Sequence, residues 1–203
     1  MFVYLVKPVL LVLCVTFPAW LICRIIWLRQ KKSAGFRVVI RHEIILLFFV
    51  MYIASVLAIT ISPASILGFN AGKAPIVNIV PVINSYKYFI STLAEPDGIA
   101  KSYAIENIIG NLLLFLPVGI FLPILNPKFK RLKNVLLLCF FCSLSIESIQ
   151  YGLRQLGTYR TVDIDDVILN TIGGLLGWLI YFKIITRCFI SSNYSTKTSN
   201  VAS

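Results

Sequence analysis

Carboxylates stand directly against apolar sequence between residues 145 and 177. Glu147 lies inside one apolar run, and Asp163, Asp165 and Asp166 precede the next one. A charged carboxylate at membrane depth costs about 2.5 to 3.5 kcal/mol on insertion scales, so such residues persist mainly where they face protein or a wet cavity. This stretch is therefore the predicted functional site.

Two sets of polar residues recur at i, i+3 and i+7, a spacing that places side chains on one face of a helix. The sets are Glu147, Gln150 and Arg154, and then Asp163, Asp166 and Asn170. Gly173 and Gly177 continue the second face and predict a small-xxx-small contact where another helix comes close. The polar residues are thus predicted to converge in one pocket rather than to face lipid.

Amide and guanidinium side chains complete the predicted site. Asn107 and Asn111 are four residues apart, so they share a helix face. The predicted ligand-binding residues are Asn78, Asn107, Asn111, Gln150, Arg154, Arg160, Asp163, Asp165 and Asn170. Glu147 and Asp166 form a hypothetical catalytic pair, because two carboxylates in different surroundings can serve as an acid and a base.

Two functions fit this set of residues. In the first, the pocket binds a ligand such as a lipid headgroup and provides recognition only. In the second, the protein is a membrane-embedded enzyme that modifies a lipid-linked or surface substrate, with Arg154 and Arg160 holding a phosphate. No nucleophile or histidine accompanies the acids, which favours binding. Packing alone is the third alternative, since interhelical amides form hydrogen bonds worth about 0.6 kcal/mol per pair.

The sequence requires no metal and names no cofactor. Carboxylate and amide oxygens are the ligands that Ca²⁺, Mg²⁺ or Mn²⁺ prefers. A divalent cation is therefore compatible with the acidic residues, and the two arginines are an equal alternative for neutralising them.

The composition defines the class of protein that carries this site. The chain has 203 residues, of which 58% are hydrophobic and 13% charged, and its mean hydropathy is +0.87. These values indicate a polytopic membrane protein with an all-α helical bundle. Five cysteines, an odd number within or beside apolar segments, argue against a disulfide framework.

Five apolar runs are long enough to cross a bilayer as helices. They are Phe2–Leu28, Glu43–Ser62, Ala104–Leu125, Asn134–Tyr151 and Asp166–Ile185. The connection before the third run is predicted to lie outside, and within it residues 82–93 have the pattern of an amphipathic helix. His42, the only histidine, is predicted to lie at the membrane interface.

Basic residues set the predicted orientation. The net charge is +11, and the bases concentrate in the short links after the first, third and fifth runs. Cytoplasmic loops carry such an excess of Lys and Arg, which predicts the N-terminus outside and the C-terminus inside. This distribution explains the charge by topology, so no nucleic-acid partner is expected, and the bilayer is the expected environment.

Several motifs in order resemble the VanZ-like family of integral membrane proteins, named for a teicoplanin-resistance protein. They are VNIVP (77–81), NIIGNLLLFLPVGIFLP (107–123), SIESIQ (145–150) and LGTYRTVDIDDVILNTIGGLLG (156–177). The resemblance implies a multi-pass protein of the bacterial cell membrane, associated with lowered susceptibility to teicoplanin-type glycopeptides. A lipid-linked cell-wall precursor or a lipoglycopeptide would be its partner.

The resemblance also divides the chain. Residues 1–42 are predicted to form the first transmembrane helix and a basic cytoplasmic link. The VanZ-like membrane domain is expected over residues 43–186, and a flexible cytoplasmic tail over 187–203.

Overall fold

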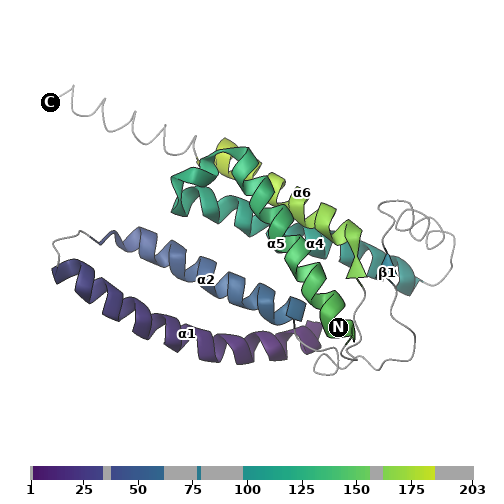
Figure 1. Ribbon diagram of the computed structural model, residues 1–203, viewed down its shortest axis with the longest axis horizontal. Helices are drawn as coiled ribbons and strands as arrows, with labels where there is room; N and C mark the ends of the chain where they lie inside the picture. The colour runs from purple at the N-terminus through teal and green to yellow at the C-terminus, as the bar shows by residue number, and fades with distance from the viewer. Residues whose placement is uncertain (1, 34–37, 62–76, 79–97, 156–161, 186–203) are drawn as a thin grey trace. The chain divides into compact units, whose positions relative to one another are not determined.

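A computed structural model describes residues 2–33, 38–61, 77–78, 98–155 and 162–185. The main helices are α1 (Phe2–Ser33), α2 (Ile40–Ile61), α4 (Gly98–Leu125), α5 (Leu132–Gln155) and α6 (Ile164–Ile180), as drawn in Figure 1. The shorter elements are the strands β1 (Val77–Asn78) and β2 (Val162–Asp163), a 3₁₀-helix at Pro127–Lys130, and a π-helix at Tyr181–Ile185.

Five helices within the described ranges are long and apolar enough to cross a membrane. The candidate spans are Val6–Ser33, Ile40–Thr60, Asn107–Leu125, Leu132–Gln155 and Ile164–Lys183. The predicted all-α polytopic fold is therefore confirmed, and the chain is a multi-pass membrane protein.

The end of α1 differs from its predicted position. Helix α1 continues to Ser33, five residues beyond the predicted end at Leu28. The added turn carries Lys31 and Lys32. Lys is a good helix former, and a cation in the last turn interacts favourably with the helix dipole. Hydropathy marks the end of the apolar run, whereas the backbone hydrogen bonds continue into the basic segment.

The chain divides into two compact units. The first unit comprises Met1–Asn84 and Leu144–Ile164, and the second comprises Ser85–Ser143 and Asp165–Ser203. Helices α5 and α6 therefore each contribute residues to both units.

In the first unit, α1 and α2 lie side by side (Figure 1). The two short strands pair in parallel, with Val77 opposite Val162 and Asn78 opposite Asp163. Small or β-branched residues of α2 are buried, including Ala54, Val56 and Ala58.

In the second unit, α4 and α6 approach until their backbones touch. A Cβ atom added at Gly173 would overlap the carbonyl oxygen of Leu112, and one at Gly177 would overlap that of Leu116. On the α4 side, a Cβ at Gly119 would overlap the backbone of Gly174. The small-xxx-small contact predicted for Gly173 and Gly177 is confirmed, because only glycine fits at this distance.

Some sequence-based predictions lie outside the described residues. These are the amphipathic helix at 82–93 and the tail at 187–203. The predicted boundaries at 42 and 186 and the orientation of the termini stay predictions.

Candidate functional site

The first polar cluster forms around Glu147 in the first unit. Glu147 projects from α5, and its side chain is buried, with 7% of the residue exposed. The backbone N–H of Asp163, in β2, donates a 3.2 Å hydrogen bond to Glu147 Oε2. Because Asp163 is also the β-bridge partner of Asn78, three segments that are far apart in the sequence meet here. The sequence predicted all three as site residues.

Gln150 lies one turn further along the same face of α5 and is also buried. Its Nε2 donates a 2.9 Å hydrogen bond to the carbonyl oxygen of Thr60. Thr60 belongs to the last turn of α2, where carbonyl groups have no partner within their own helix. Gln150 therefore caps α2, which is a structural role for a residue that was predicted to bind ligand.

The polar face of α5 is turned inward, as its spacing predicts. Glu147 and Gln150 are buried and Arg154 is half-buried, whereas Ile149 and Tyr151 are 44% and 48% exposed. In a bilayer this arrangement presents apolar side chains to lipid and keeps polar ones within the protein.

The second polar cluster joins α4 to the first turn of α6 in the second unit. Asn111 Nδ2 donates a 2.5 Å hydrogen bond to Asp166 Oδ1 and lies 3.4 Å from Asn107 Oδ1. The carboxylate at the start of α6 also suits the positive end of the helix dipole. Close backbone packing at Gly173 brings the two helices near enough for this bond.

Among the site residues whose burial the structure describes, Asn170 is the most deeply buried, with 2% exposed. Its Nδ2 donates a 2.8 Å hydrogen bond to Ser143 Oγ. Its Oδ1 has no hydrogen-bond partner among the residues that the structure describes. An unsatisfied buried acceptor costs about 1 to 3 kcal/mol, so this oxygen is a place where a ligand or a water donor would be stabilised.

The described site residues divide between the two units, and their convergence in one pocket stays a prediction. Asn78, Glu147, Gln150, Arg154 and Asp163 belong to the first unit, and Asn107, Asn111, Asp165, Asp166 and Asn170 belong to the second. Arg160 lies outside the described residues. Glu147 and Asp166 fall in different units, and their acid–base pairing stays a prediction.

The described residues form no cluster of metal ligands. Among the residues that the structure describes, no three His, Cys, Asp or Glu side chains gather closely enough to hold a metal ion. The polar side chains instead make specific contacts with amides and backbone groups.

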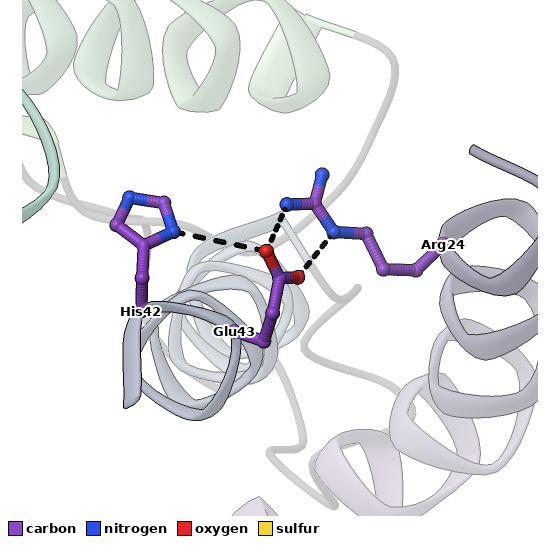
Figure 2. Close-up of polar contacts among 3 residues, drawn as sticks. All are labelled: Arg24, His42 and Glu43. Atoms are coloured by element: carbon purple, nitrogen blue, oxygen red, sulfur yellow. Dashed lines mark hydrogen bonds and ion pairs between the residues drawn. The ribbon is translucent and has the colours of Figure 1, made fainter. Parts of the chain in front are cut away.

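An ion pair between α1 and α2 was not predicted. Arg24 Nε and Nη2 donate hydrogen bonds of 2.6 and 2.7 Å to the two carboxylate oxygens of Glu43 (Figure 2). The sequence carried a signal, because Glu43 is an isolated acid beside a basic link and Arg24 is a cation within an apolar run. Pairing removes the cost of leaving either charge alone at the membrane boundary.

The described residues define a polytopic helical membrane protein in which Glu147, Gln150, Asp165 and Asn170 are buried. The model of a protein family described as VanZ/LLP1 matches residues 45–187. The chain belongs to this family, as the motifs at the two clusters indicated. Searches of curated proteins and of solved structures gave no match.

Proposed function

We propose that this protein acts in the bacterial cell membrane to lower susceptibility to teicoplanin-type glycopeptides by binding an envelope ligand through a polar pocket that opens to the outside of the cell. Membership of the VanZ/LLP1 family supports the biological setting. The burial of polar side chains in membrane-spanning helices supports a binding role. Polar residues at membrane depth are costly to insert and are found mainly at functional sites.

The burial of Asn170 is the observation that carries the proposal. Gln150 is explained by capping α2, and the glycines are explained by packing. Asn170 is buried with its Oδ1 unpaired among the described residues, and packing gives no reason for that. A ligand with a hydroxyl or amide N–H could donate the missing hydrogen bond to Asn170 Oδ1.

The ligand class follows from the chemistry of the clusters and from their setting. Carboxylates and amide oxygens accept hydrogen bonds from sugar hydroxyl and peptide N–H groups, and Arg154 can pair with phosphate. A lipid-linked cell-wall precursor or a lipoglycopeptide combines such groups with an apolar chain that fits a bilayer.

An enzyme is the alternative, and one feature favours it. Each member of the Glu147 and Asp166 pair is oriented by a neighbour, Glu147 by the Asp163 amide and Asp166 by Asn111. Acid–base catalysis requires carboxylates that are held in this way. The reaction would modify a lipid-linked or surface substrate.

Resistance measurements test the shared part of both functions. Cells that express Glu147→Gln or Asp166→Asn should lose any protection against teicoplanin while the protein accumulates in the membrane at normal levels. Ser148→Ala is the matched control, because Ser148 is exposed and, among the described residues, its hydroxyl bonds only to the Leu144 carbonyl of its own helix. Full protection from both carboxylate variants would rule the proposal out.

A second comparison separates binding from chemistry. If the protein only binds, Asp166→Asn should weaken the binding of labelled teicoplanin or of a purified lipid-linked precursor, together with resistance. If it catalyses a reaction, binding should survive while resistance is lost. In that case mass spectrometry of membrane lipids and wall precursors should reveal a product that the variant lacks.

A further inference from the structure

A pocket of about 380 Å³ lies between the end of α1 and the start of α2, on the first unit. Its lining residues are Arg24, Trp27, Leu28, Lys31, Val38, Val39, His42 and Glu43. All of them precede residue 45, where the family match begins. The pocket therefore shares no lining residue with the two polar clusters or with the family region.

Cations and one aromatic ring are gathered on a single face of α1. Arg24, Trp27 and Lys31 follow the i, i+3 and i+7 spacing that aligns side chains. The Arg24 guanidinium carbon is 4.1 Å from the centre of the Trp27 ring, and Lys31 Nζ is 5.4 Å from it. Both distances suit cation–π attraction, so the ring holds two positive groups at the pocket.

Glu43 fixes the Arg24 side chain without using all of its donors. The fork engages Nε and Nη2, and Figure 2 shows the third guanidinium nitrogen, Nη1, turned away from the carboxylate. His42 is on the opposite side of Glu43, with its Nδ1 3.9 Å from Oε1. The guanidinium therefore keeps donors for a further anion.

The length of α1 places this pocket at the boundary between the hydrocarbon core and the lipid headgroups. At 1.5 Å per residue, the stretch from Val6 to Ile25 covers a hydrocarbon core of about 30 Å. Trp27 and Lys31 follow this stretch on α1, at the depth where Trp and the ends of long cationic side chains are favoured. Large apolar side chains of α1 such as Leu11 and Val15 are exposed along the preceding turns, where acyl chains would cover them.

We propose that this pocket binds the phosphate-bearing headgroup of an anionic phospholipid. Arg24 and Lys31 provide two positive charges against the single negative charge of Glu43, and the wall contributed by Leu28, Val38 and Val39 suits the glycerol and first methylenes of the lipid. A free phosphate ion would gain nothing from that apolar wall. Under the predicted orientation the lipid belongs to the cytoplasmic leaflet, whose surface is negative.

The test compares adjacent lysines in the full-length protein. Lys31 lines the pocket, whereas Lys32 is exposed and does not, so Lys31→Gln and Lys32→Gln remove the same charge at neighbouring positions. Native mass spectrometry in a nonionic detergent would follow the first bound lipid. Phosphatidylglycerol, phosphatidylcholine with the same acyl chains, and inorganic phosphate would be titrated in separate arms.

Phosphatidylglycerol should bind the unmodified protein more tightly than phosphatidylcholine. Lys31→Gln should weaken that binding about fivefold, the factor that one Lys beside an anionic lipid contributes. Lys32→Gln should weaken it less, because Lys32 does not line the pocket. Trp27→Leu, which keeps every charge, should also weaken it because the two cations lose the ring that holds them.

Three results would overturn the assignment. They are equal losses in the two lysine variants, equal binding of the two lipids, and occupation by inorganic phosphate at the same concentrations as lipid. Because the readout is lipid binding rather than resistance, its failure would leave the proposed function of the polar clusters intact.

Discussion

Glu147 and Asp166 each have a specific hydrogen-bond donor, and the two donors differ in kind. Glu147 accepts from the backbone N–H of Asp163, whereas Asp166 accepts from the side chain of Asn111. A backbone donor survives substitution of its side chain, but the Asn111 amide does not. The position of Asp166 is therefore the more sensitive to mutation.

The strength of the bond from Asn111 to Asp166 can be measured by a double-mutant cycle. The variants Asn111→Ala and Asp166→Ala should show a coupling energy between about 0.6 and 1.7 kcal/mol, the average and upper values for hydrogen bonds between membrane helices. Unfolding by denaturant in detergent micelles would report it. Asn107→Ala is the control, because Asn107 is exposed and its bond to Asn111 is long at 3.4 Å. A coupling of zero would contradict the contact.

The Arg24 and Glu43 pair should contribute measurable stability. Both side chains are mostly buried, with 19% and 18% of their areas exposed. In Glu43→Gln the Arg24 guanidinium would therefore keep its charge in a buried place with a neutral amide as its partner. The free energy of unfolding should fall by about 1 to 3 kcal/mol. The exchange Arg24→Glu with Glu43→Arg should recover part of this loss. His42→Gln should change little, because its distance from Glu43 exceeds a hydrogen bond, and an equal loss in this control would contradict the assignment to Arg24.

Helix pairing in the second unit depends on glycine. The carbonyl oxygens of Leu112 and Leu116 occupy the space where Cβ atoms would stand at Gly173 and Gly177. This approach brings Asn111 within reach of Asp166. The stripe of small residues thus serves the polar cluster as well as the packing of α4 on α6.

A pair of glycine variants tests this contact. Gly173→Ala should lower the free energy of unfolding by about 1 to 3 kcal/mol. The added methyl group would meet the backbone of Leu112, which cannot move aside. Gly110→Ala should be neutral or slightly stabilising, because nothing lies within 4 Å of its added Cβ and alanine is the better helix former. The midpoint of thermal unfolding in detergent would be measured for both variants. Similar midpoints for the two variants would show that α4 and α6 do not touch at Gly173.

For the molecule as a whole, charge is expected to fix the orientation in the membrane. Links after α1 and α4 are rich in Lys and Arg, and such links stay in the cytoplasm. Alkaline phosphatase fused after Lys32 or Lys130 should therefore be inactive, and the same enzyme fused after Ile61 or Gln155 should be active. Green fluorescent protein at the same four positions should give the opposite pattern. An active fusion at Lys32 would reverse the predicted topology and move the lipid pocket to the outer leaflet.

The sequence alone determined the features that depend on local pattern. Length and hydropathy of each apolar run predicted five spanning helices, because a helix must satisfy its backbone within itself to cross lipid. The i, i+3 and i+7 spacing predicted which face of α5 is buried, and glycine spacing predicted the contact at Gly173. The ordered motifs indicated the family.

Only the tertiary structure decided which of these residues meet. That Asn78 pairs with Asp163, that Gln150 caps α2 at Thr60 and that Arg24 pairs with Glu43 depends on how distant segments pack. Spacing along one helix sets the direction of a side chain, but its partner is chosen by the neighbouring helix and by the distance that small residues allow. The same reason explains why the spacing placed Gln150 on the polar face of α5 but gave no sign of its bond to Thr60.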